Sequence, residues 1–151
     1  MRNKWPWTKM LDDESADYIK KLTSRVSGIR RVWLIGSRAN GRARGNSDWD
    51  FIVFSDPASF ELIRNDTALH AENIDLLVVA SDGTFCRPWG SSKSGSLESW
   101  GWECVTPARA RYVGTKWVPD QEAADEGMDT LGDIQREVLN AYLVWRDDES
   151  Y

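Results

Sequence analysis

The residues best suited to chemistry are two aspartates, Asp48 and Asp50, which stand one residue apart where an apolar segment begins. Alternate residues of a β-strand point to the same face of its sheet, so a strand here places both carboxylates on one face and Trp49 on the other. A third aspartate, Asp75, lies near the start of another apolar segment, residues 74–80. Carboxylate oxygens are the ligands that Mg²⁺ prefers. If the two segments are neighbouring strands, the three aspartates predict a magnesium site.

A Gly-Ser pair after a further apolar segment indicates a place for phosphate. Ten residues separate Ser37 from Asp48. Gly36 lets the backbone approach a phosphate without a Cβ in the way. The Ser37 hydroxyl is a good N-cap for a short helix, expected over residues 37–44, whose first N–H groups would bind anions. A guanidinium group can grip two phosphate oxygens, and three arginines lie close by, namely Arg38, Arg42 and Arg44.

Each of these signals also has a simpler structural explanation. An Asp-x-Asp after Gly-Asn-Ser is typical of a turn that leads into a strand. Asp75 equally suits a strand edge. The combination, with Gly36 and Ser37 at this distance from the Asp pair, is more specific than any one signal alone. It favours the functional interpretation over the structural one. The segment from Gly36 to Gly41 lacks the Gly-Lys-Ser or Gly-Lys-Thr ending of a P-loop, so that motif is excluded.

The spacing of apolar residues predicts the elements that must position these side chains. Helical periodicity predicts an amphipathic helix over residues 12–27 and a second helix opened by Pro57. Helices that alternate with strands predict an α/β or α+β fold with one central sheet. The expected strands are 31–35, 49–54 and 74–80, followed by a flexible loop over 90–96, helix or strand over 97–105, a strand over 108–113, a solvated acidic stretch over 120–129 and an amphipathic helix over 130–146.

Composition limits the classes of protein that the chain can belong to. With 151 residues we expect one domain spanning 1–151, and the net charge of −5 argues against a broad basic face for nucleic acid. No stretch reaches the length of a membrane span. Two cysteines, Cys86 and Cys104, form no metal-ligand spacing, and a cytoplasmic protein is expected. Of the nine tryptophans, Trp33 and Trp49 are expected in the core. Stacking on a base or a sugar is considered for Trp89, Trp100 and Trp102.

The string from Gly36 to Arg44, together with Asp48-x-Asp50 and the later Asp75, resembles the minimal nucleotidyltransferases of the DNA polymerase β superfamily. The resemblance covers about residues 12–80. It implies a mixed sheet flanked by helices, as in the polymerase β palm. It also implies transfer of a nucleoside monophosphate, most often AMP from ATP, to a hydroxyl with release of pyrophosphate. The implied metal ligands are Asp48, Asp50 and Asp75, holding two Mg²⁺ ions or Mn²⁺, with Asp75 also placed as the base. The implied nucleotide-binding residues are Gly36, Ser37, Arg38 and Arg44.

The acceptor is left open by the sequence. A protein or a small molecule is expected, and the resemblance implies that minimal members often pair with a small helical HEPN-type protein in toxin–antitoxin modules. Aminoglycoside-type antibiotics are another acceptor class of the superfamily. The alternative is a non-catalytic nucleotide-binding module of the same fold, and the presence of all three aspartates counts against it.

Overall fold

The computed structural model describes residues 10–119, 127 and 132–147, and within them eight strands form one sheet. The strands lie in the order β5-β4-β3-β2-β1-β8-β7-β6. Only neighbours β2 and β3 run parallel, so the described sheet is mixed, as expected. The elements are α1 (Asp13–Arg25), β1 (Ile29–Ile35), β2 (Trp49–Ser55), α2 (Ser59–Asn65), the 3₁₀ helix η2 (Thr67–Leu69), β3 (Ile74–Val79), β4 (Thr84–Cys86), β5 (Ser94–Ser96), β6 (Glu103–Thr106), β7 (Arg109–Pro119) and β8 (Gly132–Arg146).

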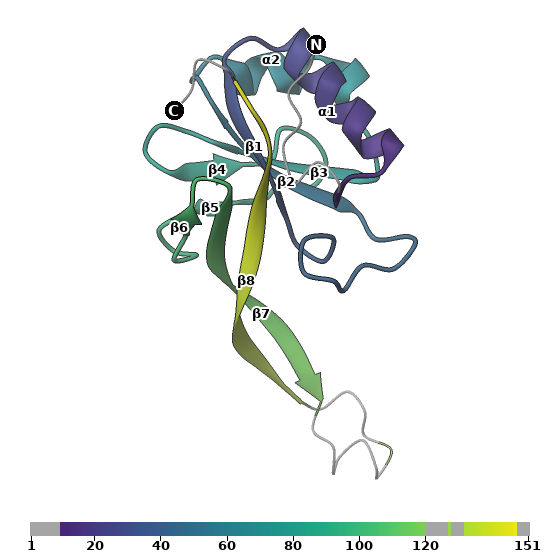
Figure 1. The fold of residues 1–151 in the computed structure, drawn as a ribbon, viewed down its shortest axis with the longest axis vertical. Helices are drawn as coiled ribbons and strands as arrows, with labels where there is room; N and C mark the ends of the chain where they lie inside the picture. The colour runs from purple at the N-terminus through teal and green to yellow at the C-terminus, as the bar shows by residue number, and fades with distance from the viewer. Residues whose placement is uncertain (1–9, 120–126, 128–131, 148–151) are drawn as a thin grey trace.

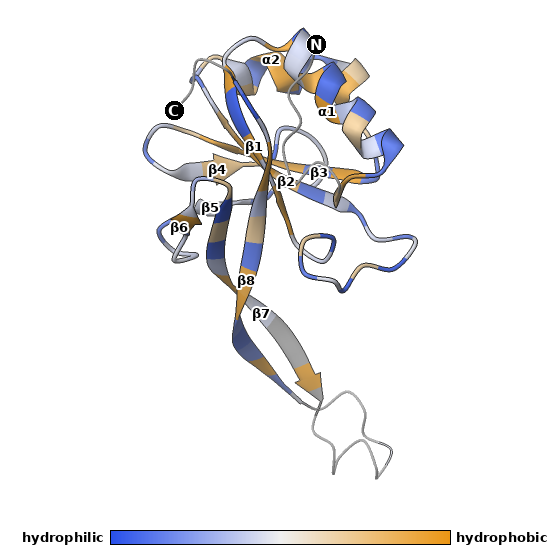
Figure 2. Ribbon diagram, in the orientation of Figure 1, coloured by the Kyte–Doolittle hydropathy of each residue, from blue (hydrophilic) through white to orange (hydrophobic). Residues whose placement is uncertain are grey.

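The two α-helices cover one face of the sheet (Figure 1). Helix α1 confirms the periodicity seen over residues 12–27: Asp12 caps it by accepting a hydrogen bond of 2.8 Å from the Ser15 N–H, and Leu22 is fully buried. The parallel strands β2 and β3 are joined through α2 and η2 on this same face. Figure 2 shows β3 as largely hydrophobic where it passes beneath the helices. Burial of this apolar layer holds β2 and β3 together, and these are the strands that carry the candidate aspartates.

The opposite face carries a second apolar core, which the sheet encloses by curling. Trp102 meets Trp33 edge to face, with ring centroids 5.3 Å apart, and Trp100 stacks on Tyr112 at the same centroid separation. The segment that bears both tryptophans, residues 97–102, connects the two ends of the sheet: the Leu97 N–H donates to the Gly83 carbonyl, and the Trp100 carbonyl accepts from β7. Trp33 and Trp49 are buried, as predicted, and Trp100 and Trp102 serve this core.

The helix predicted over 130–146 is wrong. From Gly132 onward the chain forms strand β8, and residues 130–131 lie outside the described part. Strand β8 pairs with β7 from Tyr142 to Gly132 and with β1 from Arg146 to Tyr142, so backbone bonds to two neighbours replace the helical ones. Ile134 and Val138, which a helix would turn toward the core, are 72% and 67% exposed. Tertiary pairing has overridden the local pattern.

The short helix predicted over residues 37–44 is also wrong, because this segment is a turn followed by an irregular stretch. The Ser37 carbonyl accepts from both the Asn40 and the Arg42 N–H, and Gly41 takes a positive φ of 70°. These bonds close a compact turn instead of starting a helical ladder.

Farther along, part of the loop predicted over 90–96 forms β5, while 97–105 forms a turn and most of β6. The strand predicted over 108–113 is confirmed as the start of β7. The acidic stretch 120–129 falls almost wholly outside the described residues. Among the residues that are described, no helix combines the length and hydrophobicity that crossing a membrane requires.

Candidate functional site

Two of the candidate aspartates lie next to each other on adjacent strands. Asp50 on β2 is the register partner of Asp75 on β3. Both line a small pocket on the curled face of the sheet, while Trp49 between Asp48 and Asp50 is 6% exposed and packs on the helix side. Asp48 directly precedes β2 and is exposed. Strand alternation therefore points Trp49 and Asp50 to opposite faces, as the sequence indicates.

The environment of Asp50 disfavours its ionised form. Burial, the largest cause, together with the negative charges of Asp75 and Asp48, raises the pKa of the Asp50 carboxyl to about 6, while Lys93 and Arg87 act in the opposite direction. The site thus concentrates more negative charge than its two cationic neighbours offset. A bound cation would relieve that imbalance.

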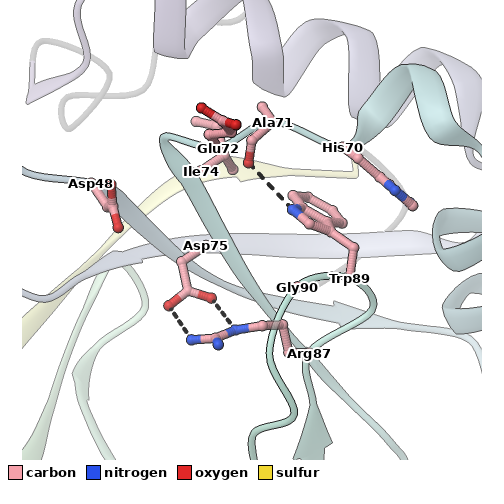
Figure 3. Close-up of a pocket in the computed structure, with 9 residues that line it drawn as sticks. All are labelled: Asp48, His70, Ala71, Glu72, Ile74, Asp75, Arg87, Trp89 and Gly90. Carbon is pink, nitrogen blue, oxygen red and sulfur yellow. Dashed lines mark hydrogen bonds and ion pairs between the residues drawn. The ribbon is translucent and has the colours of Figure 1, made fainter.

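Asp75 is held by an arginine that the sequence reasoning missed. Arg87 Nε donates to Asp75 Oδ1 and Arg87 Nη2 donates to Asp75 Oδ2, each over 2.8 Å (Figure 3). The two side chains are 19% and 21% exposed. Arg87 Nη1 also donates to the Ser91 hydroxyl and carbonyl. The turn signal at 81–83 was the available clue, because a hairpin there returns the chain along β3 toward Asp75.

The Gly-Ser turn lies directly against Asp50. Gly36 has a positive φ of 75°, and a Cβ placed on it would collide with Asp50 Oδ2. The Gly36 N–H donates to the Tyr112 hydroxyl over 2.9 Å, and the Gly36 carbonyl accepts from Asn40 Nδ2 over 2.8 Å. Asn40 also exchanges hydrogen bonds with the backbone of Asn140 on β8. Strands β7 and β8 therefore fix this turn at the edge of the aspartate site.

The arginines near the turn have separate environments. The Arg38 guanidinium carbon lies 4.5 Å from the centroid of the Trp49 ring, and Arg38 Nη2 donates to the Ser47 carbonyl over 2.7 Å. Arg42 forms an ion pair with Glu137 on β8. Arg44 is exposed. Arg38 thus braces the loop against Trp49 here, and the roles of Arg38 and Arg44 in binding phosphate stay predictions.

A larger hollow, of about 390 Å³, opens beside Asp48 and Asp75 (Figure 3). Trp89 forms part of its wall: its indole N–H donates to the Ala71 carbonyl, and its ring stacks on His70 with centroids 4.8 Å apart. Of the three tryptophans considered for stacking on a ligand, Trp89 is therefore the one beside this hollow. The small pocket on the curled face has a volume of about 170 Å³ and is lined by Gly36, Asp50, Asp75, Ile35, Leu77, Lys93, Trp100 and Tyr112. Asp75 therefore borders both spaces.

The three carboxylates suit a hard divalent cation by their chemistry. Their present arrangement is not a finished metal site, because no group of three or more His, Cys, Asp or Glu side chains within the described residues is placed to hold an ion. Arg87 occupies both oxygens of Asp75. The donor set fits Mg²⁺ by its chemistry, and an ion there would compete with Arg87 for Asp75.

Comparison with known proteins finds a family match over part of the chain. Residues 17–87, a little under half of the chain, match the family model described as "Polymerase beta, Nucleotidyltransferase". The matched segment carries the Gly-Ser turn and all three aspartates. This confirms the family that the motif resembles and the mixed α/β fold class.

The other comparisons add little to this family match. No curated protein matches the chain significantly. Among solved structures, a candidate nucleotidyltransferase from Sulfolobus solfataricus, determined at 1.40 Å resolution, is similar with a TM-score of 0.39 and 19% identity, over 50% of this chain and 68% of that one.

Proposed function

We propose that the protein is a magnesium-dependent nucleotidyltransferase that transfers a nucleoside monophosphate to a hydroxyl group and releases pyrophosphate. ATP is the favoured donor, so the group transferred is AMP. The observation that supports this most strongly is the register pairing of Asp50 with Asp75, next to a glycine turn that leaves no room for a Cβ. The match to the polymerase β-type nucleotidyltransferase family model spans all of these residues.

The reaction forms a bond between the acceptor oxygen and the α-phosphorus and breaks the bond from the α-phosphorus to the bridging oxygen of pyrophosphate. In this proposal Asp48, Asp50 and Asp75 would hold the Mg²⁺ ions, and bound ions would supply stabilisation of the negative charge on the attacking and leaving oxygens. Asp75 borders both pockets, which supports the proposal that it takes the proton of the acceptor hydroxyl. Gly36 and Ser37 would border the triphosphate at the turn beside Asp50.

The acceptor would enter the hollow beside Asp48 and Asp75. Its wall combines Trp89 with polar side chains, which suits either a small molecule or a side chain of a partner protein. A small helical HEPN-type protein is one proposed acceptor, as in a toxin–antitoxin pair. A cytoplasmic location is also proposed, and the free, exposed thiols of Cys86 and Cys104 are compatible with a reducing compartment.

The test is incubation of the purified protein with Mg²⁺, each α-³²P-labelled nucleoside triphosphate and host lysate. The proposal expects label on a discrete acceptor with one preferred nucleotide. The Asp48→Ala/Asp50→Ala double variant should transfer no label, whereas Asp17→Asn, which changes an exposed carboxylate on α1, should behave as the parent protein. Equal labelling by parent and double variant would refute the proposal.

One observation favours a second candidate function, that of a non-catalytic nucleotide-binding module. Arg87 neutralises Asp75, and a superfamily domain that binds nucleotide without turnover would keep such a pairing permanently. This alternative expects nucleotide to raise the melting temperature of the protein by mass action with no label transfer to any acceptor.

A further inference from the structure

The ion pair between Asp75 and Arg87 lies inside the candidate metal site, not at its periphery. Both carboxylate oxygens of Asp75 are used, each at 2.8 Å, by two nitrogens of one guanidinium group. A planar guanidinium group facing a carboxylate in this way is the strongest of the common ion-pair geometries. Roughly four-fifths of each side chain is shielded from solvent, so water screens the pair only partly.

A divalent cation would need the same oxygens. Mg²⁺ and Mn²⁺ bind carboxylate oxygens directly, at about 2 Å, and an ion on Asp75 would take up lone pairs of the oxygens to which Arg87 donates. The two positive charges also repel each other at that separation. Arg87 and a metal ion would therefore compete for the oxygens and the negative charge of Asp75.

Arg87 has a second set of partners that would remain after it left Asp75. Its Nη1 donates to the hydroxyl and the carbonyl of Ser91, over 2.7 and 3.0 Å. The connection between β4 and β5 that contains Ser91 also carries Lys93, which borders the pocket beside Asp50. The released guanidinium group would thus stay attached to a basic loop next to the aspartates.

We propose that Arg87 is a positioning residue that holds Asp75 in the metal-free protein and competes with the divalent cation for it. This inference rests on the proposed function and deepens it by assigning to this chain a residue that limits metal affinity. In the metal-free protein, Arg87 holds the Asp75 carboxylate in position beside Asp50. Binding of the cation includes the breaking of the Asp75–Arg87 pair.

The experiment measures Mn²⁺ binding to the full chain without nucleotide, through the loss of the electron paramagnetic resonance signal of free Mn²⁺. Arg87→Gln should bind Mn²⁺ with a Kd about ten-fold lower than the parent protein, because the cost of breaking a charged hydrogen-bonded pair is removed. Arg87→Lys keeps the charge but loses the two-pronged geometry, and its Kd should fall between the two. This second variant separates competition for the oxygens from a simple change of charge.

Two controls make the result specific. Arg64→Gln removes a cation from the surface of α2, where Arg64 pairs with Glu61 at 3.5 Å, and should leave the Kd unchanged. In an Asp75→Asn background the further change Arg87→Gln should lower the Kd much less than ten-fold, because the contested carboxylate is gone and only the loss of a charge near Asp50 remains. Circular dichroism checks that every variant is folded, and Arg87→Lys carries the test if Arg87→Gln is not.

Two results would overturn the inference, and they are distinguishable. If both Arg87 variants bind Mn²⁺ no more tightly than the parent protein while the parent still transfers label, the competition is wrong and the proposed function stands. If neither the parent nor the variants bind Mn²⁺ and no label is transferred, the proposed function fails together with the inference.

Discussion

Asp50 on β2 and Asp75 on β3 stand in register across two parallel strands, on the face of the sheet opposite Trp49. Strand order alone produces this juxtaposition. Asp50 and Asp75 are 25 positions apart in the sequence. They share one side of the sheet because β2 and β3 are neighbours and run in the same direction. The same pairing places both beside the Gly36 turn, since β1 is the other neighbour of β2.

The first prediction concerns the pH dependence of stability. The folded state raises the pKa of Asp50 to about 6 from 3.8, so between about pH 4 and pH 6 the folded protein retains a proton that the unfolded chain has lost. The contribution of this group to stability is therefore present below about pH 4 and is lost as the pH rises through about 6. In metal-free buffer, Asp50→Asn should gain stability relative to the parent protein over this range, on the order of 1–2 kcal/mol after allowance for partial exposure.

Urea unfolding in the presence of EDTA at pH 4, 5, 6 and 7 measures this difference directly. Asp17→Asn on the exposed surface of α1 is the matched control and should show no such trend. A difference in unfolding free energy between Asp50→Asn and the parent that is the same at every pH would contradict the raised pKa.

The second prediction separates two glycines with the same backbone conformation. Gly36 and Gly41 have φ values of 75° and 70°, but a Cβ on Gly36 would strike Asp50, whereas a Cβ on Gly41 meets nothing within 4 Å. Each alanine variant bears the cost of a left-handed residue, about 1 kcal/mol. Gly36→Ala should also displace Asp50 and abolish label transfer, while Gly41→Ala keeps most of it. Equal activity of the two variants would show that the contact with Asp50 does not matter.

The third prediction tests how β7 supports the turn. The Tyr112 hydroxyl accepts the Gly36 N–H, and removing it leaves a partly buried donor without its partner. Tyr112→Phe should therefore lower the unfolding free energy by about 1–3 kcal/mol, measured by chemical denaturation. A Tyr112→Phe variant as stable as the parent would argue that water replaces the hydroxyl without cost.

The fourth prediction tests the strand that replaces the expected C-terminal helix. Ile134 is 72% exposed on β8 and Leu143 is 2% exposed. Ile134→Lys should change the unfolding free energy by less than about 0.5 kcal/mol, whereas Leu143→Ala should cost about 2–5 kcal/mol. Thermal or urea denaturation ranks the two variants. A large loss for Ile134→Lys would indicate that this residue is buried, as a helix would have it.

The N-terminal half was predictable because its signals are local. Apolar residues at helical spacing and the capping Asp12 predict helix α1. The strands that carry Asp50 and Asp75 are apolar runs bounded by turn residues. The spacing of the Gly-Ser pair and the Asp-x-Asp motif then points to Gly36, Ser37, Asp48 and Asp50. Burial of Trp49 opposite Asp50 follows from the two-residue period of a strand.

What the sequence did not show depends on contacts between distant segments. Strand β8 contains apolar residues at spacings that also suit a helix, and only its pairing with β1 and β7 decides between the two structures. Arg87 stands 12 positions after Asp75, and its role is visible only once the β3–β4 hairpin has formed. Asn40 likewise meets Asn140 across 100 positions. The periodicity of one sequence reports local structure and does not predict such long-range contacts.

The most direct test of the central claim is label transfer by three single variants under one set of conditions, with Mg²⁺, α-³²P-ATP and host lysate. Asp50→Asn and Asp75→Asn should each lower the transfer rate by at least about 100-fold, as expected when a metal-binding carboxylate is lost, and Asp17→Asn should retain the parent rate. Transfer by Asp50→Asn or Asp75→Asn at the parent rate would show that the paired aspartates are not the catalytic centre.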